Sequence, residues 1–119
     1  MKLLAVYRVT VFVPQQHLQG VIDGVCAVDP LRIGDYEHVM WTSLAAEQFR
    51  PLPGAVPTLG RVGALERGDS VRLEFCIPRE TERLRLVLEQ GIVPHHPWEI
   101  PAIFIDESWF PLPQFVAGP

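Results

Sequence analysis

Three histidines and one glutamate could form a metal site in this 119-residue sequence. These candidates are His38, His95, His96 and Glu99, and imidazole together with carboxylate suits zinc, copper or nickel. Adjacent histidines in one extended segment point in opposite directions, which argues against His95 and His96 binding the same ion. The alternative is that His96 and Pro97 begin a rigid turn in which the imidazole caps backbone groups. We therefore expect no cofactor, with a divalent transition metal as the alternative.

A stretch rich in proline and glycine carries two arginines that could hold an anion. Residues 49–63 have few other side chains that can do chemistry. If this stretch lines a cleft, Arg50 and Arg61 are candidate ligand-binding residues, because the guanidinium fork suits carboxylate and phosphate. Backbone N–H groups of the glycines could cradle the same anion, although the prolines remove some of these donors.

The sequence patterns of well-known catalytic sites are missing. There is no Gly-x-Ser-x-Gly, no Walker-type loop and no Cys-x-x-Cys in the sequence. Ser43 and Ser70 have no evident His and Asp partners. Cys26 and Cys76 are expected to act as small buried hydrophobic residues rather than as a redox pair. The sequence therefore predicts a protein that is not an enzyme.

Two strands, each followed by a proline and a helix, must position these residues. Residues 3–13 are rich in valine, and residues 70–77 alternate between apolar and polar side chains, so both segments are predicted strands. Pro14 and Pro78 suit the first position of a helix. The apolar stripe of the first helix is Leu18, Val21, Ile22, Val25 and Cys26, and that of the second is Leu84, Val87 and Leu88.

Glycines are expected to weaken the first helix and to end the second. Gly20 and Gly24 each cost the first helix about 1 kcal/mol relative to alanine, so tertiary packing must hold it. Gly91 lies where a C′ residue would end the second helix.

An extended stretch after each helix completes a repeated order of elements. Residues 36–44 follow the first helix, and residues 102–106 follow the second. Strand–helix–strand, twice within about a hundred residues, is the order of a split βαβ unit. The sequence therefore predicts an α+β, ferredoxin-like βαββαβ sandwich, with a four-stranded antiparallel sheet and both helices on one face.

The composition is typical of one globular domain spanning residues 1–119. Apolar residues make up 48% of the chain and charged residues 20%, which is enough for a core without disulfides. A net charge of −4 argues against a nucleic-acid or anionic-membrane partner. Apolar runs end well before eighteen residues and no signal-like segment opens the sequence, so we expect no membrane span and a cytoplasmic location.

Two proline-rich segments are expected to make contacts of their own. Residues 45–60 join the two halves, and a loop of this length in a compact domain is usually functional. The apolar tail at 108–119 carries Trp109, Phe110 and Phe115, so we expect it to pack on the domain or on a neighbouring subunit. Edge strands of a small open sheet also need cover. We therefore predict a homo-oligomer, with a trimer favoured over a dimer.

Three stretches of the sequence, taken together in this order and spacing, resemble one family. They are Arg32-Ile33-Gly34-Asp35-Tyr36-Glu37-His38, then Phe49-Arg50-Pro51 with residues 54–66, and His96-Pro97-Trp98-Glu99-Ile100-Pro101-Ala102. The resemblance is to the insert domain of the Nif-three-like proteins, and it covers roughly residues 5–107. It implies a fold akin to the CutA and PII trimers.

The departures from this family limit what the resemblance implies. Full-length members have two flanking α/β halves that carry the ligands of a dinuclear metal site, and this sequence lacks those halves, so their metal centre and hydrolase chemistry are not carried over. The family usually has Tyr-Glu-Glu-Pro where this sequence has Trp98-Glu99-Ile100-Pro101, which removes one carboxylate.

The resemblance also suggests where a ligand could bind. PII-like trimers bind small molecules between subunits, which makes Tyr36, Glu37 and His38 further candidate ligand-binding residues at the start of the second strand. The alternative is ordinary alternation along an edge strand. We expect a non-enzymatic, oligomeric PII/CutA-like module that binds a small ligand or signals at subunit clefts. The alternatives are a transition-metal-binding protein and a structural assembly domain.

Overall fold

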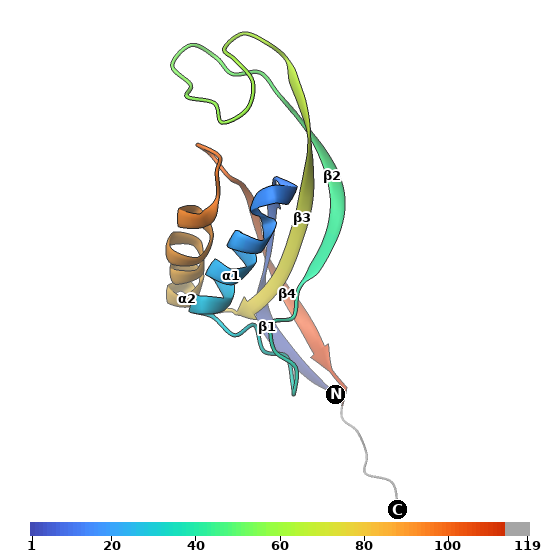
Figure 1. Ribbon diagram of the computed structural model, residues 1–119. Coiled ribbons are helices and arrows are strands. Elements are labelled where there is room, and N and C mark those ends of the chain that lie inside the picture. The colour runs from blue at the N-terminus through green and yellow to red at the C-terminus, as the bar shows by residue number, and fades with distance from the viewer. Residues whose placement is uncertain (114–119) are drawn as a thin grey trace, which may run out of the picture.

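Four antiparallel strands form one sheet in the computed structural model, which describes residues 1–113. The strands lie in the order β2-β3-β1-β4, and the helices that follow β1 and β3 cover one face of the sheet (Figure 1). This arrangement confirms the predicted βαββαβ, ferredoxin-like fold. The strands are β1 (Lys2–Val13), β2 (Trp41–Phe49), β3 (Glu66–Pro78) and β4 (Ala102–Leu112).

The helices begin and end differently from the sequence-based expectation. Pro14 precedes a 3-10 turn at Gln15–His17, and Pro78 is the last residue of β3, so neither proline is the first residue of an α-helix. Gly91 does not end the second helix but lies within a π-helical turn, where its φ is not positive. The helical segments are α1 (Leu18–Val28), α2 (Thr81–Leu86), the π turn Val87–Ile92 and a 3-10 turn at Val93–His95.

The hydrophobic core lies between the helices and the two central strands. Alternate residues of β1 and β3 face the helices and are paired in register, as in Val9 with Phe75 and Val11 with Leu73. These four side chains are fully buried, and burial of each contributes about 1.5–3 kcal/mol to folding. The rest of the core comprises Val13, Val21, Val25, Leu31, Ile77, Val87 and Ile92. Within residues 1–113, no helix is long and apolar enough to cross a membrane.

The second strand begins five residues later than predicted. Residues 36–44 were expected to be extended, but β2 starts only at Trp41. Leu31 and His38 both have positive φ, 49° and 57°, so the backbone folds into a turn. Tyr36 pairs with Ile33 inside this turn and is 77% exposed. Tyr36 and His38 therefore do not lie on the second strand.

The hairpin of β2 and β3 is longer than predicted, and the loop it carries is displaced. The first five residues of the predicted 45–60 loop continue β2, because Ala45 pairs with Ser70 and Phe49 pairs with Glu66. The loop spans 50–65 instead. The last strand also extends past the predicted residue 106, so that part of the predicted 108–119 tail belongs to β4, whose Leu112 pairs with Lys2. Residues 114–119 of that tail lie outside the described residues.

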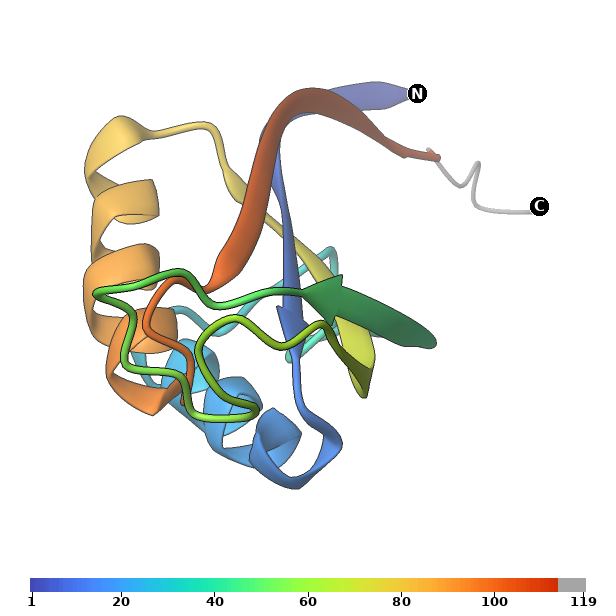
Figure 2. The same cartoon turned by 90° about the horizontal axis from the view of Figure 1, so that it is seen from above.

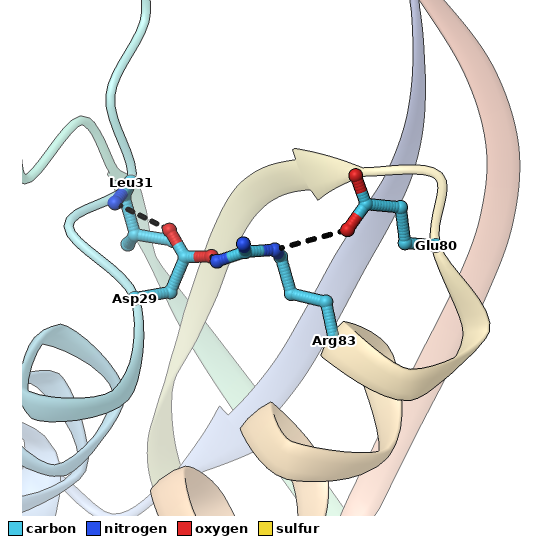
Figure 3. Close-up of polar contacts among 4 residues, drawn as sticks. All are labelled: Asp29, Leu31, Glu80 and Arg83. Atoms are coloured by element: carbon cyan, nitrogen blue, oxygen red, sulfur yellow. Dashed lines mark hydrogen bonds and ion pairs between the residues drawn. The ribbon is translucent and has the colours of Figure 1, made fainter.

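A buried carboxylate joins the two helical segments. Asp29, whose side chain is 4% exposed, follows α1. One of its oxygens accepts the N–H of Leu31 at 2.7 Å, and the other contacts Nη1 of Arg83 at 2.7 Å. Figure 3 shows Arg83 between Asp29 and Glu80, whose carboxylate lies 3.5 Å from Nε of the arginine. This network holds the positive φ of Leu31 in place and fixes the start of the α1–β2 turn relative to α2.

Candidate ligand pocket

A cavity of about 550 Å³ opens between the loop at 50–65 and the segment that leads into β4. We call it the loop pocket. A volume of this size is typical of sites for small molecules. Most of its lining is apolar, and the polar groups that line it are Glu47, Gln48, Arg50, Thr58 and Glu99. The apolar lining includes Phe12, Phe49, Leu59, Trp98, Ile100 and Phe104.

The floor of the loop pocket is fixed by strand register. Thr10 pairs with Phe104 and Phe12 pairs with Ala102, so these residues share the sheet face that is turned away from the helices. The rings of Phe12 and Phe104 meet edge to face, with their centroids 6.4 Å apart. Because edge-to-face contacts of this kind are favourable, the two aromatic side chains form a defined surface.

The loop at 50–65 is held against the segment before β4. The hydroxyl of Thr58 donates to the carbonyl of Pro97 at 2.6 Å, and the N–H of Val56 donates to the carboxylate of Glu99 at 3.3 Å. Figure 2 shows the loop lying beside this segment. At the base of the loop, the N–H of Gly63 donates to the carbonyl of Pro51 at 2.7 Å. These three hydrogen bonds fix the position of the loop that forms this wall of the pocket.

His96 anchors the other wall. Its Nε2 lies 2.7 Å from the carbonyl oxygen of Phe12, and its Nδ1 accepts the N–H of Trp98 at 3.1 Å. Because a carbonyl only accepts, Nε2 carries the proton and the ring is neutral. His96 is 8% exposed, and this burial lowers the pKa of the imidazole. The ring therefore connects the end of β1 to the segment that carries Trp98, as in the turn-capping alternative.

The four candidate metal ligands are not brought together. His38 lies in the α1–β2 turn, at the opposite end of the sheet from the loop at 50–65 (Figure 1). His95 is exposed, both ring nitrogens of His96 are hydrogen-bonded, and Glu99 holds Val56. Among residues 1–113, no group of three or more His, Cys, Asp or Glu side chains could hold a metal ion.

The five candidate ligand-binding residues fall into two separate places. Tyr36, Glu37 and His38 are exposed in the α1–β2 turn and do not line the loop pocket. Arg50 lines the pocket, whereas Arg61 does not. The two arginines are therefore not equivalent, although the sequence offered no means of separating them.

Sequence reasoning missed several residues of the pocket. Phe12, Phe104 and Glu47 were not singled out, because they lie on strands that were interpreted only as sheet. A signal was present at Phe104, since alternation in the last strand places this large apolar residue on the face away from the core, where it is 61% exposed.

Burial raises the pKa of the Glu47 carboxyl.

The two cysteines remain separate thiols. Cys26 packs against the core from α1, and Cys76 lies on β3. Both are half-buried and neither forms a disulfide. Burial raises the pKa of both thiols, and for Cys26 the nearby carboxylates of Asp23, Asp29 and Glu37 raise it further. A raised pKa disfavours the reactive thiolate.

Comparison with known proteins gives relatives that are much longer than this chain. No family model matches. A GTP cyclohydrolase 1 type 2 homolog of Mycobacterium leprae is 35% identical over 95 residues, which are 80% of this chain and 24% of that protein. A solved Bacillus cereus protein related to NIF3 aligns with a TM-score of 0.73 and 29% identity, over 91% of this chain and 27% of that one. The chain resembles a segment of NIF3-related proteins. The resemblance predicted from its motifs is confirmed.

The chain spans about a quarter of the length of the curated relatives it matches. Its fold is also found in a protein of ordinary domain size. CutA from Synechococcus elongatus aligns with a TM-score of 0.59 over 90% of this chain and 82% of CutA. At 16% identity this likeness concerns the fold alone, and it confirms the CutA-like arrangement.

Proposed function

We propose that this NIF3-related chain is a non-enzymatic, self-associating module that binds a small, largely apolar molecule in the loop pocket. The observation that carries the proposal is the pocket itself, with a volume of about 550 Å³ and walls of aromatic and aliphatic side chains. Such walls supply contact area, and a few polar groups at the rim orient the ligand. The pocket is built from two segments of this chain that are joined by hydrogen bonds.

The relatives' name does not carry an activity over to this chain. The M. leprae relative is named a GTP cyclohydrolase 1 type 2 homolog, but the match covers 24% of it. The resemblance places the metal ligands of full-length members in the flanking halves, outside this segment. The proposal therefore assigns binding, and not catalysis, to the pocket.

Filling the pocket should abolish binding of a neutral aromatic probe. We expect indole to bind the wild-type protein with a dissociation constant of about 1 mM or lower. Ala102 lies opposite Phe12 in the sheet and lines the pocket, so the Ala102→Trp side chain should occupy the space and remove the binding. Ala46 is exposed and does not line the pocket, so Ala46→Trp should bind indole normally. Isothermal titration calorimetry measures all three, and the absence of heat with the wild-type protein would refute the proposal.

Self-association is supported by two open sheet edges. Within residues 1–113, β2 pairs only with β3 and β4 pairs only with β1, which leaves backbone groups of both edge strands without partners. Large apolar side chains are exposed on these same strands, including Trp41 and Phe104. We expect light scattering at micromolar concentration to give about three times the 13.4 kDa monomer mass. A monomer mass that does not change with concentration would contradict this part of the proposal.

A further inference from the structure

Two charged side chains of the loop pocket have no partner within the part of the chain that the structure describes. Glu47 and Arg50 both line the cavity. The side-chain hydrogen bonds and ion pairs of residues 1–113 involve other groups. Glu47 is half-buried, and its charge beside apolar walls is unfavourable because it loses water without gaining a counter-charge. Arg50 is exposed, so its guanidinium group is free to bind an anionic group of a ligand.

The surroundings of Glu47 favour a cationic ligand group. The residue is half-buried on β2 and pairs in register with Gly68. A Cβ atom added at Gly68 would lie 3.2 Å from Oε1 of Glu47 and 3.3 Å from Cδ2 of Leu59, so the carboxyl group lies close to the backbone of β3 and to an apolar side chain. The raised pKa of Glu47 reflects this burial. An ammonium group nearby would stabilise the ionised carboxylate.

The position of Arg50 favours a carboxylate. It is the first residue after β2 and the only cationic residue that lines the described pocket. Guanidinium groups bind carboxylates through two parallel hydrogen bonds. The pocket also contains Glu99, whose carboxylate accepts the N–H of Val56. With two carboxylates and one guanidinium, the lining disfavours a plain anion, which would meet repulsion from both glutamates.

We propose that the loop pocket binds α-amino acids with a large apolar side chain. The carboxylate of such a ligand pairs with Arg50, its ammonium group pairs with Glu47, and its side chain contacts the aromatic wall that includes Trp98. This inference rests on the proposed function, because it names the class of molecule for the same pocket. It differs from the sequence-based expectation, in which two arginines hold an anion.

The test compares four probes that share the indole ring and carry different charges. They are L-tryptophan (zwitterion), L-tryptophanamide (cation), N-acetyl-L-tryptophan (anion) and indole (neutral), each titrated calorimetrically into the full chain at pH 7. We expect tryptophan to bind about tenfold or more tightly than each of the other three, because only the zwitterion makes both charge-assisted contacts. The Arg50→Ala and Glu47→Gln variants should each lose this advantage, so that tryptophan binds them no more tightly than indole does.

Matched controls come from charged residues that do not line the pocket. Arg61→Ala removes a positive charge from the 50–65 loop, and Glu66→Gln removes a negative charge from the start of β3. Both variants should keep the preference for tryptophan. Thermal melts of all four variants verify that each is folded before titration.

Each alternative result has its own meaning. If indole binds and tryptophan binds no more tightly, the amino-acid inference is overturned and the ligand pocket stands. If N-acetyltryptophan equals tryptophan, the assignment of Glu47 is overturned, and the site is one for simple anions. If none of the four probes binds the folded wild-type protein, both the inference and the proposed function are refuted.

Discussion

Replacing Gly24 by alanine should lower the free energy of unfolding by about 3 kcal/mol, although alanine is the better helix former. A Cβ atom at this position of α1 would lie 2.5 Å from the carbonyl oxygen of Gly91 and would also overlap Cδ2 of His95. The imidazole could move away, but the backbone oxygen could do so only if the two helical segments separated. Gly24 and Gly91 therefore lie at a close approach between α1 and the π turn.

The matched substitution at Gly20 should have the opposite sign. Gly20 lies on the same helix and is exposed, and an added Cβ would meet nothing within 4 Å. Gly20→Ala should stabilise the protein by about 0.5–1 kcal/mol, because alanine loses less backbone entropy on folding. Urea unfolding followed by circular dichroism measures both variants. Changes of the same sign and size would mean that helix propensity, and not the contact with Gly91, decides the effect.

Replacing His96 by alanine should cost about 3 kcal/mol of stability and weaken indole binding. The carbonyl of Phe12 and the N–H of Trp98 would both lose their partner, and a cavity would remain where the ring was. The wall carrying Trp98 would also lose its anchor on β1. His95→Ala is the control, because His95 is exposed and should change stability by less than about 1 kcal/mol. Equal effects of the two substitutions in urea unfolding would contradict this role of His96.

The same ring predicts a pH dependence with a definite sign. Burial holds the pKa of folded His96 below its usual value, which is about 6.5. Between that usual value and the lower folded value, the unfolded chain binds more protons than the folded one, so stability falls as the pH is lowered through this window. The contribution of neutral His96 to stability is fully present at pH values above the pKa of the unfolded state. Between pH 7.5 and 5, the free energy of unfolding should therefore fall more steeply for the wild-type protein than for His96→Ala. An equal pH dependence of the two proteins in urea unfolding would contradict this prediction.

The fold was predictable because its central strands carry simple patterns. Strict alternation over residues 70–77 and the valines of β1 identify the two strands that bear the core. The start of β2 was not predictable in this way, because it depends on positive φ at Leu31 and His38, which are not glycines. The Asp29 carboxylate accepts the N–H of Leu31 and is itself held by Arg83, which lies 54 residues further along the chain. Spacing along the sequence gives no sign of that long-range contact.

The candidate site was harder to predict than the fold, because its parts meet only through long-range register. Phe12 and Phe104 are adjacent because β1 and β4 pair across some ninety residues of sequence. His96 was singled out as a candidate metal ligand, and its two nitrogens lie within hydrogen-bond distance of backbone groups. Spacing along the chain also treated Arg50 and Arg61 alike, whereas the course of the loop brings only Arg50 to the pocket.

The pairing of Lys2 with Leu112 has a consequence for how such a fold can be used in evolution. Paired strands lie about 5 Å apart, so residues 2 and 112 enter and leave the fold side by side (Figure 1). A surface loop of a host protein could therefore accept this unit at the cost of a small gap, without stretching the host backbone. In the relatives, the matched segment is about a quarter of the chain. This is compatible with an insertion whose two ends are the paired ends of β1 and β4.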